Sequence, residues 1–158
     1  MRILHHPGFY MAGLAARTCN AREMSGTGKI EGIWETFLRP GVVGRIPNKM
    51  GIDLVAVYTD YETDHTGYYT YLLGLPVISG EAFPSDLTIR HITAGRYAVI
   101  TSERGALADV VQGAWQRIWS MPEKELGGKR AFRTDFEIYD QRASDPENAQ
   151  IDVYIGLR

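Results

Sequence analysis

An internal repeat is the feature that most constrains the fold of this chain. Residues 30–37 read IEGIWETF and residues 111–118 read VQGAWQRI, so a glycine and a tryptophan recur at an offset of 81 positions (30 to 111). The same offset relates residues 55–58 (VAVY) to residues 136–139 (FEIY). Self-similarity at a fixed period indicates that one structural unit occurs twice. Within a single domain of residues 1–158, we therefore expect two copies, at about residues 8–80 and 87–158.

Both copies show the same order of expected elements, which is strand, helix, strand, strand. In the first copy, residues 8–18 read as a strand and residues 30–38 carry apolar side chains at helical spacing. In the second copy, the helical stripe begins at Leu107 and β-rich segments flank it. The sequence thus predicts an α+β fold, in which two helices cover one face of an antiparallel sheet. A pseudo-twofold axis should relate the halves, with a cleft between them.

Composition and charge limit the classes of function. The net charge of -2 offers no basic face for direct nucleic-acid binding. The lone Cys19 excludes an intrachain disulfide and fits a reducing compartment. No apolar run approaches the roughly 20 residues of a membrane helix, and the N-terminus lacks the apolar core of a signal peptide. We expect a cytoplasmic protein that binds no membrane. The histidines show no metal-ligand spacing, so we expect neither a metal nor a cofactor.

The two copies differ at one position that bears on function. Ala56 of the first copy corresponds to Glu137 of the second, within an otherwise apolar strand. Side chains alternate across a strand, so Phe136 and Ile138 should face the helices, while Glu137 and Tyr139 should face the opposite side. If that side is open to water, Glu137 is simply a solvated surface residue. If it is concave, Glu137 lies in a cleft at the junction of the two copies.

The repeat also brings aromatic side chains to the carboxylate. Tyr58 is the counterpart of Tyr139, so two related tyrosines should share a face with Glu137. Aromatic ring faces carry negative potential, and a carboxylate adds a formal charge at reduced dielectric. A flat, hydrophobic organic cation would match both features, whereas an anion would match neither. The sequence therefore favours a cationic ligand if a cleft is present.

Four segments of the second copy resemble a known family. They are residues 94–105 (AGRYAVITSERG), 114–119 (AWQRIW), 135–140 (DFEIYD) and 151–157 (IDVYIGL). They resemble the gyrase-inhibitory-protein-like (GyrI-like) domain, which also forms the effector-binding part of AraC-type and MerR-type multidrug regulators. Stand-alone versions occur among integron cassette proteins, and this chain looks most similar to those. The resemblance covers nearly all of residues 8–158.

This resemblance implies both a fold and a site. It implies a duplicated strand–helix–strand–strand unit that binds lipophilic cations between its halves, with Glu137 and Tyr139 in the pocket. Tyr71 on the neighbouring strand and Tyr97 on the strand before the second helix are further candidates for ligand contact. For each of these aromatic candidates, packing in the core is an alternative of at least equal weight. The remaining aromatic candidates are Trp34, Phe37, Trp115 and Trp119.

The leading hypothesis is a protein that senses or sequesters hydrophobic organic cations. No DNA-binding helix-turn-helix is evident, so control of transcription would require a DNA-binding regulator as partner. Two alternatives stay open. Some members of the resembled family hydrolyse electrophilic cyclopropane-bearing compounds, and here Glu137 and Tyr139 would be the catalytic pair. The other alternative is an interaction protein that inhibits a partner such as gyrase.

Overall fold

One antiparallel sheet forms the frame of the molecule. The computed structural model describes residues 1–81 and 83–158, and in these residues eight strands pair in the order β1-β6-β8-β7-β3-β4-β2-β5. The strands are β1 (Arg2–His6), β2 (Phe9–Cys19), β3 (Leu54–Thr59), β4 (Tyr68–Val77), β5 (Thr88–Ile92), β6 (Gly95–Thr101), β7 (Arg130–Tyr139) and β8 (Asp152–Leu157). The helices are α1 (Asn20–Met24), α2 (Ile30–Phe37), α3 (Leu107–Ser120) and α4 (Glu123–Leu126), with 3-10 turns η1 (Val43–Arg45) and η2 (Gln141–Ala143).

The predicted repeat is confirmed in three dimensions. The first copy runs β2-α2-β3-β4 and the second runs β6-α3-β7-β8, while β1 and β5 add to the two outer edges of the sheet. The copies meet where β3 pairs with β7 in antiparallel register. In that register Ala56 lies opposite Glu137, although the two are also equivalent positions of the repeat. The pseudo-twofold axis therefore passes between these two residues.

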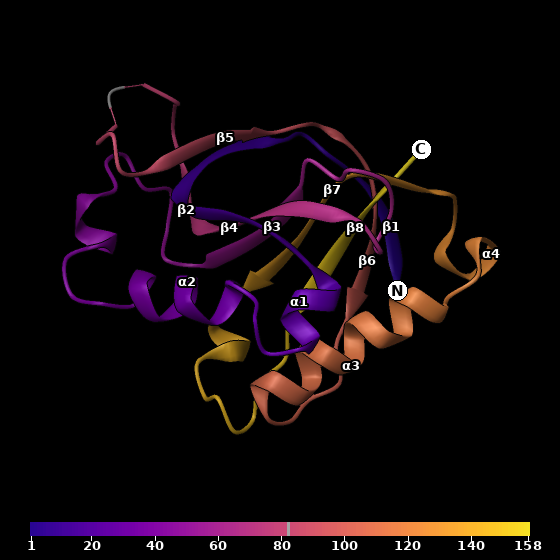
Figure 1. The fold of residues 1–158 in the computed structure, drawn as a ribbon. Coiled ribbons are helices and arrows are strands. Elements are labelled where there is room, and N and C mark those ends of the chain that lie inside the picture. Colours follow the sequence, from indigo (N-terminus) through magenta and orange to yellow (C-terminus); the bar gives the residue numbers. More distant parts are fainter. Residues whose placement is uncertain (82) are drawn as a thin grey trace.

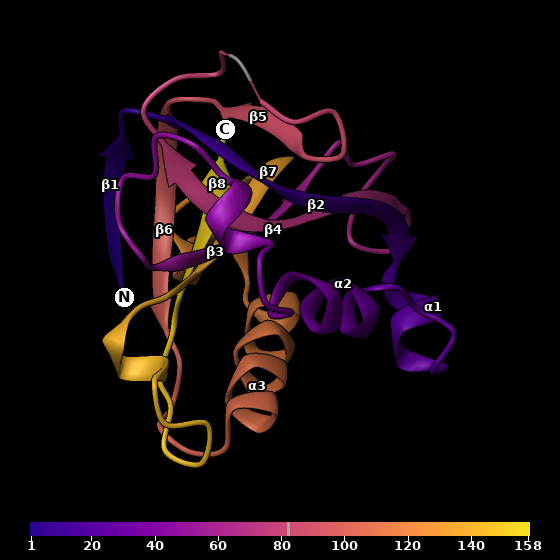
Figure 2. The same cartoon turned by 90° about the vertical axis from the view of Figure 1, so that its left-hand side faces the viewer.

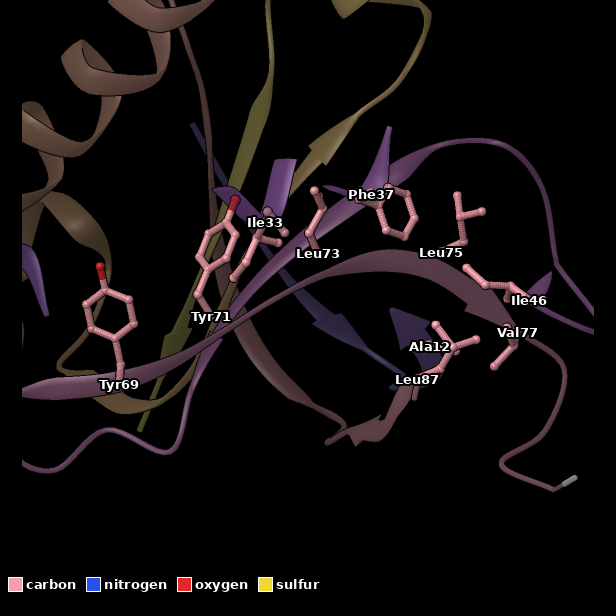
Figure 3. Packing of buried hydrophobic residues seen from close by; sticks show 11 residues of the cluster. Ala12, Ile33, Phe37, Ile46, Tyr69, Tyr71, Leu73, Leu75, Val77 and Leu87 are labelled. Carbon is pink, nitrogen blue, oxygen red and sulfur yellow. The ribbon is translucent and has the colours of Figure 1, made fainter. Parts of the chain in front are cut away.

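Both long helices, α2 and α3, lie on the same face of the sheet (Figures 1 and 2), as the sequence predicts. Ile33 and Phe37 of α2 pack in a cluster with Tyr71 and Leu73 of β4, which Figure 3 shows from close by. The side chain of Trp115 on α3 packs in a second cluster, against strand residues of the second copy. Tyr58 and Tyr139 contact both clusters, so the two halves are joined at the β3–β7 seam.

The expected assignment of faces is wrong. Glu137 and Tyr139 lie on the helix-covered face, whereas Phe136 packs in a cluster made only of strand residues. That cluster exists because the sheet curls. Phe136 on β7 and Phe9 on β2 have ring centroids 5.4 Å apart, although three strand spacings would separate these strands by roughly 14 Å in a flat sheet. With both faces buried, apolar alternation along β7 does not reveal which face the helices cover.

Paired glycines allow two strands of the curled sheet to approach closely. Gly13 of β2 lies opposite Gly74 of β4 in the register. A Cβ atom at Gly13 would overlap the carbonyl oxygen of Leu73, and one at Gly74 would overlap that of Ala12. Only glycine therefore fits at these two positions, where the strand backbones cross at short range.

Candidate functional site

A buried carboxylate lies at the seam between the two copies. Glu137 is fully buried, and its two oxygens accept three hydrogen bonds. Oε2 accepts from Nε1 of Trp115 at 2.6 Å and from the hydroxyl of Tyr58 at 2.9 Å, and Oε1 accepts from the hydroxyl of Tyr139 at 2.7 Å. These donors satisfy the carboxylate, and within residues 1–81 and 83–158 no cationic side chain pairs with it, so it carries an uncompensated negative charge whenever it is ionised.

The repeat explains why these donors converge. Tyr58 and Tyr139 are equivalent residues, and the antiparallel pairing of β3 with β7 places them on either side of the axis, next to Glu137. Trp115 comes from α3, whose apolar stripe packs onto this face of the sheet. The carboxylate is thus held by one donor from each of three elements, so its orientation is fixed before any ligand arrives.

Burial and hydrogen bonding act in opposite directions on this group. Burial raises the pKa of Glu137 above its ordinary value of 4.5, and the hydrogen bonds from Trp115, Tyr139 and Tyr58 counter that increase. Burial, together with the nearby carboxylate, also raises the pKa of Tyr58 and of Tyr139. Both phenols therefore stay protonated at neutral pH and remain hydrogen-bond donors.

A cavity of about 400 Å³ opens beside this carboxylate, between the two halves. This volume lies within the roughly 300–1,000 Å³ of ordinary small-molecule sites. Tyr58 and Trp115 line the cavity and also donate to Glu137, which itself lies behind them. These two aromatic rings therefore lie between the carboxylate and the cavity. The other aromatic rings in the wall are those of Tyr61, His65, Tyr69 and Trp119.

A model of the integron-associated effector binding proteins, Cass2, matches residues 2–157. The chain belongs to this family. A solved integron cassette protein from the mobile metagenome of Vibrio cholerae is 27% identical with a TM-score of 0.77, over 99% of this chain and 95% of that chain. YobU of Bacillus subtilis, which is named as a transcriptional regulator, is 30% identical over 93% of this chain and 91% of its own length.

The fold of the Cass2 family extends to more distant proteins. SAV2435, solved in complex with tetraphenylphosphonium, has a TM-score of 0.78 over 99% of this chain and 93% of that chain. At 16% identity this likeness concerns the fold alone. The family match and the likeness to YobU make this chain an effector binding protein related to transcriptional regulators.

Several aromatic residues predicted for the site form a layer behind the cavity. The indole of Trp34 donates to the hydroxyl of Tyr71 at 2.9 Å, and its ring lies 4.9 Å from that of Tyr139. Tyr71 in turn packs 5.1 Å from Tyr58, edge to face. Phe37 is fully buried in the core under α2. Tyr58 lines the cavity, whereas the described cavity lining does not include Trp34, Phe37, Tyr71 or Tyr139, which lie behind it.

The structure does not bring Tyr97 to this site. Tyr97 belongs to the strand-only cluster on the opposite face, where its hydroxyl donates to the carbonyl of Thr93 at 3.1 Å. Burial raises its pKa to about 12. The sequence made Tyr97 a candidate for ligand contact, and the structure corrects this. On β6 its side chain points to the sheet face opposite the helices, away from the cavity. Trp119, by contrast, lies in the cavity wall together with Trp115.

Two charged cavity residues, Glu23 and Arg130, were missed by sequence reasoning. The carboxylate of Glu23 accepts from the hydroxyl of Thr18 and from the backbone amides of Lys29 and Ile30, so it caps the start of α2. Arg130, the first residue of β7, also lines the cavity. Both residues come from segments that differ between the two copies, so the repeat gave no signal for them.

No metal site accompanies this cavity in the described part of the chain. Residues 1–81 and 83–158 contain no group of three or more His, Cys, Asp or Glu side chains that could hold a metal ion. None of the described helices is long and apolar enough to cross a membrane. The chemical features of the site are thus aromatic rings, tyrosine hydroxyls and a small number of fixed charges.

Proposed function

We propose that this effector binding protein takes lipophilic organic cations into the cavity between its halves, and so senses or sequesters them. The observation that carries the proposal is the buried carboxylate of Glu137, whose donors Tyr58 and Trp115 are themselves cavity walls. A cation stacked on these rings would gain from the ring faces and from the charge behind them.

The hydrogen bonds add to this effect in a specific way. When a phenol or an indole donates to a carboxylate, electron density shifts toward the ring, and chains of such bonds polarise one another. The rings of Tyr58 and Trp115 would therefore attract a cation more strongly than the same rings without Glu137. A ligand of this kind fills an aromatic cavity and needs no direct contact with the carboxylate. The complex of SAV2435 with tetraphenylphosphonium supports the same ligand class for a protein of this fold.

The burial of Glu137 favours binding over hydrolysis. The carboxylate has no exposed surface, and both of its oxygens already accept hydrogen bonds. A general base must reach the water or substrate that it deprotonates, directly or through one water molecule. Glu137 is separated from the cavity by the two rings, so we propose a binding role for it. A DNA-binding regulator that reads the occupied state would connect this binding to transcription.

A matched pair of probes tests the proposal. Methyltriphenylphosphonium and triphenylphosphine oxide have nearly the same shape, but only the first carries a net charge. We expect both to quench tryptophan fluorescence, because Trp115 and Trp119 line the cavity, and we expect the cation to bind at least about tenfold more tightly. Equal affinity for the two probes, or no saturable binding of either, would refute the proposal.

A further inference from the structure

A second cavity of about 200 Å³ adjoins the first one. The two share three lining residues, which are His65, Trp119 and Arg130. The imidazole of His65 stacks on the indole of Trp119, with ring centroids 6.2 Å apart and an interplanar angle of 22°. We call these three shared side chains the partition between the cavities. A ligand that is longer than the first cavity would reach the second by moving these side chains.

Arg130 lies at this partition, and not all of its N–H donors have partners among the described residues. Its side chain is 10% exposed, and Nη2 donates to Oδ2 of Asp135 at 2.8 Å. The guanidinium carbon lies 4.3 Å above the ring of Phe132. Its Nε atom is buried and has no hydrogen-bond partner among residues 1–81 and 83–158. A buried, unpaired N–H donor is costly unless something else satisfies it, so a small turn of the guanidinium that brings this atom to an acceptor at the partition would remove part of that cost.

The sign of the charge changes from one cavity to the other. The first cavity contains Glu23 and adjoins Glu137. The described lining of the second contains Lys129, Arg158 and the acidic Glu123. Arg130 also lines it, but the charge of Arg130 is paired with Asp135. The backbone amide of Arg158 donates to the carbonyl of Lys129 at 2.9 Å, which keeps these two basic residues together. A ligand that spans both cavities would meet a negative region and then a positive one.

We propose that the two cavities form one bipartite site for aromatic zwitterions, which place a cationic aromatic group in the first cavity and a carboxylate in the second. Arg130 is the residue that receives the carboxylate at the partition, with Lys129 and Arg158 adding charge beyond it. This inference rests on the proposed function, because the first cavity must hold the cation. It narrows the ligand class from lipophilic cations in general to those that carry an acidic substituent.

Three phosphonium probes separate the two cavities. Tetraphenylphosphonium reports on the first cavity alone, and (4-carboxyphenyl)triphenylphosphonium adds a carboxylate on one ring. The primary carboxamide of that acid has almost the same size without the negative charge. By calorimetry at pH 8, we expect the acid to bind at least about fivefold more tightly than the carboxamide, since hydrogen bonds to charged groups are stronger than neutral ones. The preference should shrink as salt concentration rises.

Two variants and one control test whether the basic residues cause the preference for the acid over the carboxamide. Arg130→Lys retains a positive charge near Asp135 but removes the Nε donor, and Lys129→Gln with Arg158→Gln changes only exposed side chains of the second cavity. Both variants should lower the ratio of the Kd of the carboxamide to the Kd of the acid toward one. Lys124→Gln with Arg117→Gln removes the same charge outside both cavities and should preserve the ratio. Thermal unfolding confirms that each variant is folded.

The outcomes distinguish this inference from the function on which it rests. If tetraphenylphosphonium binds but the carboxamide equals or exceeds the acid in affinity, the bipartite site is refuted and the cation site stands. A preference for the acid that survives in both cavity variants would also refute the assignment. If none of the three probes binds, the proposed function itself fails, and the bipartite site fails with it.

Discussion

Replacing Glu137 with glutamine separates the charge of this side chain from its hydrogen bonds. The amide oxygen of glutamine can accept from Trp115 and Tyr58, as Oε2 does in the wild type, and its nitrogen can donate to the hydroxyl oxygen of Tyr139. The geometry is therefore retained while the charge is lost. Burial raises the pKa of Glu137, so burying its ionised form costs folding free energy. We expect the variant to be at least as stable as the wild type at pH 8, where the wild type must bury the charge.

The size of the effect on binding follows from Coulomb's law. Oε2 of Glu137 lies 2.6 Å from Nε1 of Trp115. A cation stacked on that indole would lie roughly 7 Å from the oxygen, and at an effective dielectric constant of about 20 the attraction is about 2 kcal/mol. This corresponds to about 30-fold in Kd. Glu137→Gln should therefore weaken the binding of methyltriphenylphosphonium about 30-fold and change that of triphenylphosphine oxide by less than about twofold.

Fluorescence titration of both probes at pH 8 and low salt measures these constants, with thermal unfolding as the check on folding. Glu23→Gln is the matched control, because Glu23 lies in the cavity wall and its charge is held by the amides at the start of α2. We expect a smaller loss in this control. Unchanged cation affinity in a folded Glu137→Gln variant would refute the role of Glu137. A larger loss in Glu23→Gln would assign the charge to that residue.

Two further predictions concern pH and packing. Because a bound cation favours the ionised form of Glu137, whose pKa burial raises above 4.5, the affinity of the wild type for methyltriphenylphosphonium should increase with pH through this raised pKa. Calorimetry in buffers of different ionisation enthalpy should detect proton release on binding at pH values near and below this pKa. A flat profile of affinity against pH would contradict the expectation. Gly13→Ala should destabilise the protein by about 1–3 kcal/mol, because the new methyl group overlaps the carbonyl oxygen of Leu73. Gly32→Ala on α2 meets nothing within 4 Å and should stabilise by about 0.5–1 kcal/mol, so equal melting temperatures of the two variants would contradict the packing argument.

Periodicity predicted the six repeated strands and the two long helices because each of them carries a clear apolar pattern. It missed β1, which has only two apolar residues before two histidines and is followed by Pro7, although His6 packs edge to face against Phe9. It also missed α1 and α4, which are too short for a helical stripe. The wrong assignment of faces has a different cause. In β7 both Phe136 and Glu137 are fully buried, and alternation along one strand cannot rank two covered faces.

The centre of the candidate site could be predicted because the repeat allows equivalent residues of the two copies to be compared directly. The difference between Ala56 and Glu137 identified the carboxylate, and the equivalence of Tyr58 and Tyr139 identified two of its donors. The cavity wall beyond them could not be predicted in this way. Tyr61 comes from the segment between β3 and β4, which is not shared by the copies. Its place depends on long-range packing that leaves no local pattern.

The pairing of Ala56 with Glu137 at the pseudo-twofold axis limits how such a site can be assembled. Residues directly opposite on antiparallel strands have Cβ atoms about 5 Å apart, so a symmetric dimer of one repeat would place two carboxylates face to face in a buried space. Two such groups cannot both ionise, and they would share a proton. A homodimer also cannot carry alanine on one side and glutamate on the other. Joining both copies in a single chain removes this restriction and permits a symmetric scaffold to hold one acidic side chain at its axis.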